Sequence, residues 1–245
     1  MRLRVVKIIY ILWTPKGQPK QTTKDLLLNK IQPKLYDAGI KKLTMYIDDE
    51  YSNVRSSAPK LYGGPEISAE LSLWIDNIER HLEIEIILES GLFTYAGFEV
   101  EESIYTEYGG NKHFHKRDWP DGQRSPVLMA ITLMERPKKL SREEWIARWH
   151  GTQSPVSEAM QPRARYIRNV VLQALTPDAP PFEGIVEEAW PSVKHYTNPF
   201  LFYGAGKMNI LKLVANMYRM LRSVSAFLEL NKIRSSTMSE YILKS

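Results

Sequence analysis

The residues Val127-Leu-Met-Ala-Ile-Thr-Leu-Met134 decide how this chain folds. They form a nearly continuous apolar run, whereas a strand with one face in water alternates apolar and polar side chains. The run Ile8–Trp13 near the start of the chain has the same character. Short apolar runs between turn residues are typical of strands that are covered on both faces. We therefore expect the sheets of this protein to be buried on both sides.

The order of the predicted elements repeats. Each half reads strand, helix, strand, strand, helix, strand, which is the split βαβ or ferredoxin-like arrangement. A helix is predicted to start at Ser141, where Ser141-Arg-Glu-Glu144 fits a capping box. The other predicted elements are strands at Val6–Trp13, Lys42–Asp48, Ile67–Trp74, Phe98–Glu107, Val127–Met134, Tyr166–Gln173, Gly184–Trp190 and Ser239–Lys244, and helices over Thr23–Ala38 (interrupted at Pro33) and up to Leu88.

Helices in this arrangement cover only one face of each sheet. Two sheets packed face to face, one from each half, would cover the other face. We therefore predict an α+β fold in which two ferredoxin-like domains in tandem form a dimeric-type α+β barrel. The predicted domains are residues 1–110 and 126–245, joined by a polar, solvated linker at 111–125. The sequence leaves open whether the two halves close on each other or pair across two chains.

The composition excludes several classes of protein. The 245 residues are 43% hydrophobic and 25% charged and contain no cysteine, so disulfides, thiolate nucleophiles and cysteine-ligated metals are excluded. No apolar run approaches the roughly 20 residues that span a bilayer. The opening apolar run ends at Trp13, too soon for a secretory segment, and a cytoplasmic location is expected. Nucleotide-binding, zincin and α/β-hydrolase motifs are absent from the sequence.

The formal charge of +5 is concentrated near the C-terminus. The segment Ala205–Arg234 holds six basic residues, beginning with Lys207, and one acidic residue. The periodicity predicts an amphipathic helix with a basic outer face, which is either a solvated face or a surface for a membrane or a nucleic acid. We favour the solvated face, and expect no nucleic-acid partner and no membrane span. The predicted buried stripe is Met208, Leu211, Val214, Tyr218 and Leu221, and the predicted outer side is Lys212, Asn216 and Arg219.

The second half resembles the EthD family, a branch of the dimeric α+β barrel superfamily. The residues that carry the resemblance are Ser141–Gly151, Pro155, Arg165–Val171, Leu175–Pro181, Gly184–Trp190 and Ser239–Tyr241. The resemblance implies the barrel fold and a small-molecule site, and it is compatible with a homodimer. The family commonly has a histidine four residues after the helix tryptophan, but Gln153 stands there in this chain. A glutamine can hydrogen-bond a substrate but cannot transfer a proton near neutral pH.

Three side chains are candidates for proton transfer. His150 follows Trp149 on the predicted helix, and a cavity-facing histidine would have a pKa near neutrality; the alternative is a buried or surface histidine without a catalytic role. Glu187 and Glu188 alternate on one strand, so at least one of them faces the interior of a sheet covered on both sides. That carboxylate is either a base with a raised pKa or the partner of an arginine such as Arg165 or Arg168.

Other residues are candidates for substrate binding. By strand parity Tyr166 and Arg168 share a face that Asn169 does not, and they could stabilise an enolate or carboxylate oxygen, or simply form the edge of the barrel. Trp149, Gln153 and Trp190 complete the predicted binding residues. His113 and His115 alternate in the linker, but we expect no metal site because no third ligand is evident.

These features predict a lyase- or oxidoreductase-like enzyme that transfers a proton without an organic cofactor or a metal. Its substrate would be a small apolar molecule with a carbonyl group or an aromatic ring, and dehydration, decarboxylation, cyclisation and oxygenation all remain open. His150, Glu187 and Glu188 are the predicted catalytic residues. One alternative is a non-catalytic ligand-binding or accessory protein that supports an oxygenase. Another is a haem protein with His150 as the axial ligand.

Overall fold

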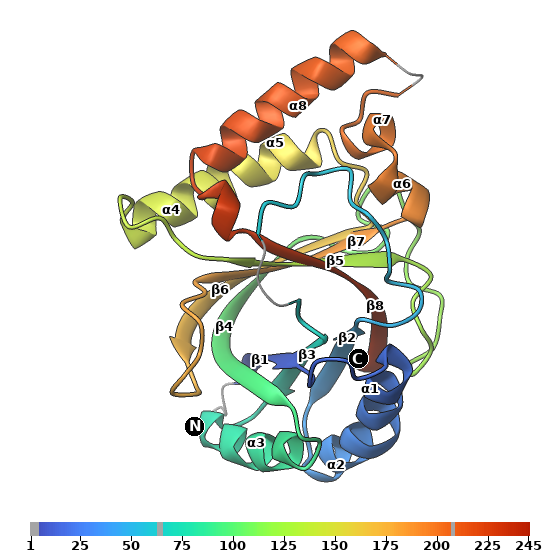
Figure 1. Ribbon diagram of the computed structural model, residues 1–245, viewed down its shortest axis with the longest axis vertical. Coiled ribbons are helices and arrows are strands. Elements are labelled where there is room, and N and C mark those ends of the chain that lie inside the picture. Colours follow the sequence, from blue (N-terminus) through green and yellow to red (C-terminus); the bar gives the residue numbers. More distant parts are fainter. Residues whose placement is uncertain (1–4, 63–65, 207–208) are drawn as a thin grey trace.

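A computed structural model describes residues 5–62, 66–206 and 209–245, and in it eight antiparallel strands close into one barrel (Figure 1). The strand order around the barrel is β1-β3-β2-β8-β5-β7-β6-β4. The first half therefore contributes the order β4-β1-β3-β2, and the second half contributes the same order again as β8-β5-β7-β6. The two halves meet where β2 pairs with β8 and where β4 pairs with β6. The barrel thus closes within one chain.

The strands lie close to their predicted positions, and β1 and β7 match them residue for residue. The strands are β1 (Val6–Trp13), β2 (Lys42–Ile47), β3 (Ala69–Ile75), β4 (Thr94–Thr106), β5 (Leu128–Met134), β6 (Arg165–Ala174), β7 (Gly184–Trp190) and β8 (Arg234–Lys244). The α-helices are α1 (Lys20–Leu26), α2 (Gln32–Asp37), α3 (His81–Glu89), α4 (Arg142–Arg148), α5 (Ser154–Glu158), α6 (Val193–Thr197), α7 (Pro199–Phe202) and α8 (Ile210–Ser225).

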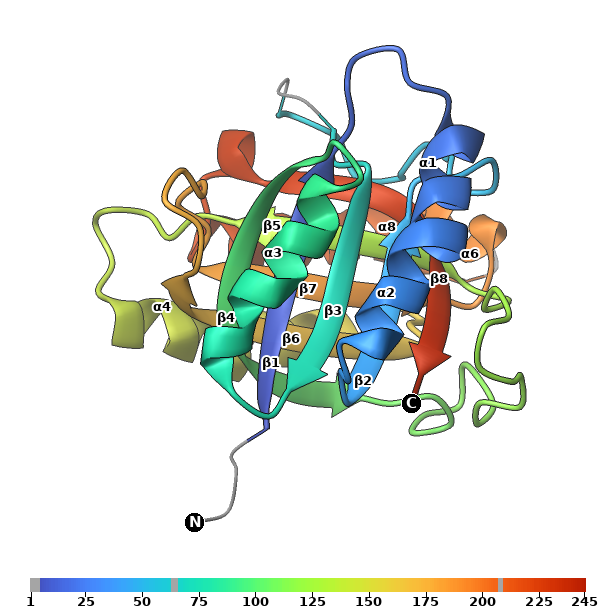
Figure 2. The ribbon, with the colours of Figure 1, turned by 90° about the horizontal axis from the view of Figure 1, so that it is seen from below.

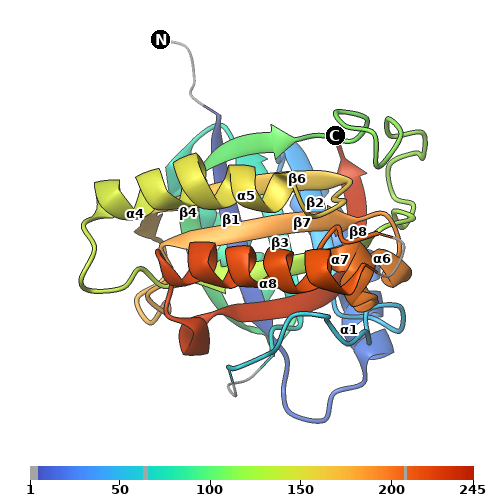
Figure 3. The ribbon, with the colours of Figure 1, turned by 90° about the horizontal axis from the view of Figure 1, so that it is seen from above.

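Both faces of the barrel sheet are covered, as the continuous apolar strands predicted. Helices α1, α2 and α3 cover the outside of the first half (Figure 2), and α4, α5 and α8 cover the outside of the second half (Figure 3). The inside of the barrel is filled by its own side chains, among them Ile9, Met129 and Ile185. Continuous burial stabilises strands of this kind by roughly 25 cal/mol for each Å² of apolar surface removed from water.

The first helix of each half contains a π-helical segment. Leu27–Ile31 joins α1 to α2, and Trp149–Gln153 joins α4 to α5. In both cases a proline follows as the second residue of the next helix, Pro33 or Pro155. Proline lacks a backbone N–H and its ring clashes with the preceding turn, so widening that turn lets the helix continue. The predicted capping box at the start of α4 is present.

The segment between the two halves is not the solvated linker that the sequence predicted. Tyr108, Phe114 and Trp119 form an aromatic cluster that packs on the core inside the barrel. The N–H groups of Gly122 and Ser125 donate hydrogen bonds to carbonyl groups of β8. The charged residues made this segment look solvated, but its few aromatic side chains bury enough apolar surface to order it. It closes one end of the barrel.

Helix α8 forms as predicted, but the apolar stripe that was predicted to be buried is exposed. Of the predicted outer residues Asn216 is buried, whereas Lys212 and Arg219 are exposed as predicted. Leu211 is 85% exposed and Tyr218 is 65% exposed, whereas Asn216 is only 7% exposed. The predicted positions Lys207 and Met208 lie outside the described residues. Asn216 is inside because its side-chain amide donates a 2.7 Å hydrogen bond to the Tyr203 carbonyl. Periodicity identifies an apolar stripe, but it does not say which side of the helix meets the protein.

Candidate functional site

The predicted site residues lie on two sides of the second-half sheet. Glu187 points into the barrel, where its neighbours on β7, Ile185 and Ala189, belong to the interior core. The other residues lie in the layer between the sheet and helices α4, α5 and α8. They are Trp149, His150, Gln153, Tyr166, Arg168, Glu188 and Trp190. The strand parity predicted from the sequence is therefore right, but His150 and Glu187 are on opposite faces and cannot act on the same substrate atom.

The π-helical segment places Trp149, His150 and Gln153 against the sheet. Trp149 is buried and its indole N–H donates a 3.2 Å hydrogen bond to the Tyr166 hydroxyl. The close approach of helix and sheet depends on Gly184, because a β-carbon there would lie 2.8 Å from Trp145 and 2.9 Å from Trp149. π-Helical turns often occur at functional sites, since they re-aim side chains that a regular helix would place elsewhere.

His150 is a half-buried imidazole whose Nε2 atom is buried and has no hydrogen-bond partner among the described residues. Its ring packs edge-on against Trp149, with 4.8 Å between ring centroids. Burial, with a smaller contribution from the positive charge of Arg168, lowers the pKa of His150 to about 4. The expected pKa near neutrality is thus wrong, because both effects penalise the imidazolium form. At neutral pH His150 is neutral and able to accept a proton.

Further buried polar atoms in this layer have no described partner, on Trp145, Arg163, Trp190 and Ser223 as well as on Gln153 and Arg168. Gln153 contacts the Met220 sulfur through its Nε2 atom at 3.2 Å, and its buried Oε1 atom has no partner in the described part of the chain. Arg168 donates to the hydroxyls of Ser154 at 3.2 Å and Ser103 at 2.8 Å, but its buried Nε–H has no described acceptor. Buried polar groups are normally satisfied, so several unsatisfied ones in a single layer indicate a place for a polar ligand or water.

Tyr166, Glu188 and Trp190 are held more tightly than these groups. The Tyr166 hydroxyl lies 3.2 Å from both Trp149 Nε1 and Ser154 Oγ, and burial raises its pKa. Glu188 forms an ion pair with Arg163, with 2.6 Å between the carboxylate oxygen and the guanidinium nitrogen. The Arg163 guanidinium lies 3.8 Å from the centroid of the Tyr166 ring. Trp190 stacks on Phe202 at 4.7 Å. Glu188 is therefore engaged by an arginine, as one alternative predicted, although the arginine is neither Arg165 nor Arg168.

Glu187 belongs to an ionic cluster inside the barrel. It accepts hydrogen bonds from Lys7 at 2.8 Å, Tyr46 at 2.7 Å and Asn169 at 2.9 Å. Burial by itself raises the pKa of Glu187, but the Lys7 ammonium and these hydrogen bonds outweigh it and lower that pKa to about 2. The expected raised pKa is therefore wrong for this carboxylate. Lys7 from the first half is its ion-pair partner, in place of the predicted arginine.

The group with the raised pKa is Glu70, which sequence reasoning missed. Glu70 is fully buried on β3, and burial together with the negative charge of Glu187 raises its pKa well above the ordinary value. The Ser72 hydroxyl lies within hydrogen-bond distance of both carboxyl groups, 3.1 Å from Glu70 and 3.0 Å from Glu187. An acidic residue within the apolar run Ala69–Ile75 was a detectable signal, since strand alternation places Glu70 and Ser72 on one face.

A second interior cluster surrounds Glu240 on β8. This buried carboxylate accepts hydrogen bonds from Tyr108 at 2.7 Å, Ser125 at 2.6 Å and Arg165 at 3.2 Å. Tyr108 and Ser125 belong to the segment between the halves, so this network fastens that segment to the barrel. Each lone pair of the carboxylate that is hydrogen-bonded offsets the desolvation of its charge. We assign Glu240 and Arg165 a structural role.

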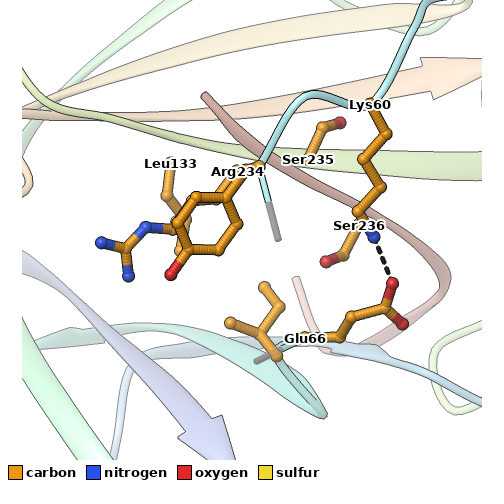
Figure 4. Close-up of a pocket in the computed structure, with 8 residues that line it drawn as sticks. Lys60, Glu66, Leu133, Arg234, Ser235 and Ser236 are labelled. Atoms are coloured by element: carbon orange, nitrogen blue, oxygen red, sulfur yellow. Dashed lines mark hydrogen bonds and ion pairs between the residues drawn. The ribbon is translucent and has the colours of Figure 1, made fainter. Parts of the chain in front are cut away.

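Two surface depressions lie away from His150. The smaller one, of about 10 Å³, has room for about one water molecule between Leu133, Arg234 and the Lys60–Glu66 ion pair (Figure 4). The larger one, of about 170 Å³, is an opening at the end of the barrel where Lys7 and Trp74 lie below the acidic β4 residues Glu99, Glu101 and Glu102. Neither depression is lined by His150, Gln153 or Arg168.

The structure bears on the histidine pair of the central segment and on the haem alternative at His150. Among the described residues no cluster of three histidine, aspartate or glutamate side chains could hold a metal ion, and His115 instead stacks on Phe114 at 4.4 Å. A haem bound through His150 would need a flat opening next to Nε2. That atom is buried, and Trp145, Trp149 and Tyr166 fill the adjoining layer. The residues around His150 therefore do not fit a haem.

Comparisons with known proteins establish the fold. The structure resembles an anthrone oxidase-like protein, with a TM-score of 0.54 and 11% identity over 98% of this chain and 94% of that chain. It also resembles a mutant chlorite dismutase from Candidatus Nitrospira defluvii, with a TM-score of 0.49 and 8% identity over 98% and 92% of the two chains. No family model matches the chain. No curated protein matches it. Within the described residues no helix is long and apolar enough to cross a membrane.

Proposed function

We propose that this protein is an enzyme that removes a proton from a small apolar carbonyl or aromatic compound, with His150 as the base and no bound cofactor. The observation that supports it is the neutral, half-buried His150, whose buried Nε2 atom has no partner in the described structure. The lowered pKa keeps His150 in its proton-accepting form at neutral pH but makes it a weaker base than an unperturbed histidine, so the proposed reaction depends on stabilisation of the anion that forms. Glu188 and Glu187 are not the base in this proposal, because each is held in an ion pair.

The neighbouring groups suit the charge that such a reaction develops. When the C–H bond breaks, the proton moves to His150 Nε2 and the electron pair moves onto the carbonyl oxygen as an enolate. In this proposal that oxygen is stabilised by Arg168, whose Nε–H is unpartnered in the described structure, and by the Gln153 amide. Trp149 and Tyr166 form the rigid wall behind them.

The side chain of Met220 fills the space in front of Gln153. Methionine is flexible and leaves a packed layer at lower cost than an aromatic side chain does. A small substrate would take the place of Met220 between α8 and the sheet, which limits it to a compact, mostly apolar molecule. Dehydration, cyclisation and oxygenation with O₂ as co-substrate can each begin with such a proton transfer. In a decarboxylation the C–C bond to the carboxylate breaks with loss of CO₂, and a proton must then be delivered to the enolate that remains. All four remain the reactions we propose.

The proposal includes membership of the superfamily branch that the second half resembles. We propose that the chain is a divergent EthD-like protein with two ferredoxin-like domains, residues 1–110 and 126–245, and that it acts in the cytoplasm. The repeated strand order β4-β1-β3-β2 and β8-β5-β7-β6 supports the two-domain division.

The proton transfer can be tested with anthrone, the compound class in the name of one structural neighbour. Exchange of the acidic ring CH₂ protons of anthrone with D₂O, followed by NMR, measures proton removal whatever reaction follows. We expect the wild type to accelerate exchange and His150→Gln to lose about 10²–10⁴-fold of that acceleration. His195→Gln is the matched control, because burial also lowers the pKa of His195 but it lies outside this layer. Equal exchange by the wild type and His150→Gln, on anthrone and on a panel of aryl ketones, would disprove the assignment.

One observation favours a non-catalytic, ligand-binding alternative. Gln153 stands where the resembling family commonly has histidine, so the layer has lost one titratable group. If anthrone or an aryl ketone binds, as followed by tryptophan fluorescence, but does not exchange faster, the protein is a binding or accessory protein. A gain of exchange in Gln153→His would then indicate that the rest of the catalytic arrangement is intact.

A further inference from the structure

Helix α8 presents an apolar stripe to the surroundings of the protein. Residues that recur every three or four positions along it are exposed by 42–85%, although they are large and hydrophobic. They are Ile210, Leu211, Val214, Met217, Tyr218 and Leu221. Figure 3 looks onto this helix and shows no described element lying over it. A contiguous exposed stripe of this size marks a surface that meets something else.

The stripe is not a packing error of an ordinary surface helix. The opposite side of α8 is anchored to the protein by the Asn216 amide at the Tyr203 carbonyl and by buried Met220 and Ser223. These anchors fix the rotation of the helix about its axis. Rotating α8 to bury Leu211 and Tyr218 would expose Met220 and break the Asn216 hydrogen bond. The fold therefore holds the stripe outward.

The charges on α8 identify what the stripe meets. Lys212, Arg219 and Arg222 are exposed, the helix Ile210–Ser225 contains no acidic residue, and none of the three forms an ion pair with a described residue. A second copy of this helix would bring its own three cations against these without an acidic partner. A nucleic acid would leave the apolar stripe in water. An anionic lipid surface satisfies both features, since its headgroups pair with the cations while its acyl region receives the stripe.

We propose that α8 docks this protein on anionic membrane surfaces, lying in the plane of the interface with Leu211, Val214, Tyr218 and Leu221 toward the lipid. The inner side of the same helix supplies Met220 to the His150 layer. A docked α8 would therefore place that layer next to the bilayer, where small apolar molecules concentrate. The docking itself does not depend on any chemistry at His150.

The test is sedimentation of the full chain with vesicles. One set contains phosphatidylcholine alone, and the other contains about one-third phosphatidylserine. We expect binding to the anionic vesicles that is at least several-fold tighter than to neutral ones and that weakens as salt is raised, because the cations interact through a screened field. Activity is not measured, so this result is separate from that of the exchange assay.

Matched variants locate the surface. Leu211→Gln with Tyr218→Gln should weaken binding by at least about tenfold, because two exposed apolar side chains no longer enter the lipid. Leu82→Gln with Ile86→Gln on α3 is the control, since these residues are 56% and 68% exposed at the opposite end of the molecule. Lys212→Gln and Arg219→Gln should each cost about fivefold on anionic vesicles, whereas Lys16→Gln and Lys30→Gln should not. All these positions are exposed, and circular dichroism checks that each variant folds.

Three results would overturn the proposal. The first is no sedimentation of the wild type with either vesicle. The second is binding that the α8 variants and the α3 control reduce equally. The third is a dimer, seen by light scattering, that Leu211→Gln with Tyr218→Gln dissociates while vesicle binding is absent; the stripe would then belong to a second copy of the chain.

Discussion

The two halves of the barrel cover their sheets with similar helices, yet among the described residues unpartnered buried polar atoms lie in only one of the two helix–sheet layers. In the first half the π-helical segment begins Leu27-Leu28 and ends at Ile31, and these side chains join an apolar core. In the second half the corresponding segment begins Trp149-His150 and ends at Gln153. Each segment is followed by a helix with proline as its second residue. The two halves therefore share the π-helical turn and differ in the side chains that it carries.

This difference separates the role of the π-turn from that of the side chains on it. Since Leu27–Ile31 shows that the turn forms without any functional group, the turn follows from the proline and needs no ligand. What distinguishes the second half is that His150, Gln153 and Arg168 keep unpartnered buried atoms. Such atoms reduce stability, and retaining them is typical of a layer used for binding or catalysis.

The largest effect is expected where the halves are joined. Lys7 of the first half is buried and paired with Glu187 of the second at 2.8 Å. Lys7→Met leaves that carboxylate without its cation, and we expect a loss of about 3–5 kcal/mol in the free energy of unfolding, measured with urea. Adding Glu187→Gln should recover much of the loss. A double variant as unstable as Lys7→Met would mean that packing of the lysine stem, and not the charge, joins the halves.

The next effect tests the comparison by exchanging residues between the two layers. Ile31→Gln puts an amide into the apolar layer and should cost about 2–4 kcal/mol in the free energy of unfolding. The reciprocal Gln153→Ile should change it by no more than about 1 kcal/mol, because Oε1 of Gln153 already has no described partner. Urea unfolding of both variants measures the asymmetry. Equal losses would show that Gln153 is an ordinary structural residue.

A smaller effect is expected from pH. The pKa of His150 is about 4 in the folded chain, against about 6.5 for an unperturbed histidine. The unfolded chain therefore binds the proton more readily, and the free energy of unfolding falls as the pH drops from about 6.5 to about 4. Because His150 is only half-buried, this fall is on the order of 1 kcal/mol. His150→Gln should lose that part of the pH dependence, seen in urea unfolding at pH 7 and pH 5. The same slope in wild type and variant would contradict the buried, neutral imidazole.

The smallest effect concerns the starts of the two helices. Ser141 caps α4 through a complete capping box, whereas α1 begins at Pro19 without a side-chain cap. Ser141→Ala should lower the free energy of unfolding by about 1 kcal/mol, and Gln21→Ala on the first turn of α1 by less than about 0.5 kcal/mol. Thermal unfolding by circular dichroism resolves the two. If Gln21→Ala and Ser141→Ala lowered the free energy of unfolding equally, the two helix starts would not differ in their contribution to stability.

Much of the fold could be predicted because it depends on local patterns. The apolar runs predicted the bounds of β1 and β7. Strand alternation predicted that Tyr166 and Arg168 lie on the other face of the sheet from Asn169, and that Glu187 and Glu188 lie on different faces. The site was harder to predict. Lys7 and Glu187 are far apart in the chain, so no local pattern could pair them. The sequence shows Glu70 as an acidic residue in an apolar strand, but it does not show that the charge of Glu187 lies beside it.

The order of elements, the covered sheet faces, the capping box and the side of the sheet on which each residue lies were determined by the sequence alone. They follow from the 2-residue and 3.6-residue repeats of strand and helix, which neighbouring residues impose. The tertiary structure decided that His150 is neutral, that Glu187 is paired with Lys7, that the central segment closes the barrel and that α8 turns its apolar stripe outward. Those properties depend on desolvation and on which distant groups come within a few ångströms, and both arise only when the whole chain has packed.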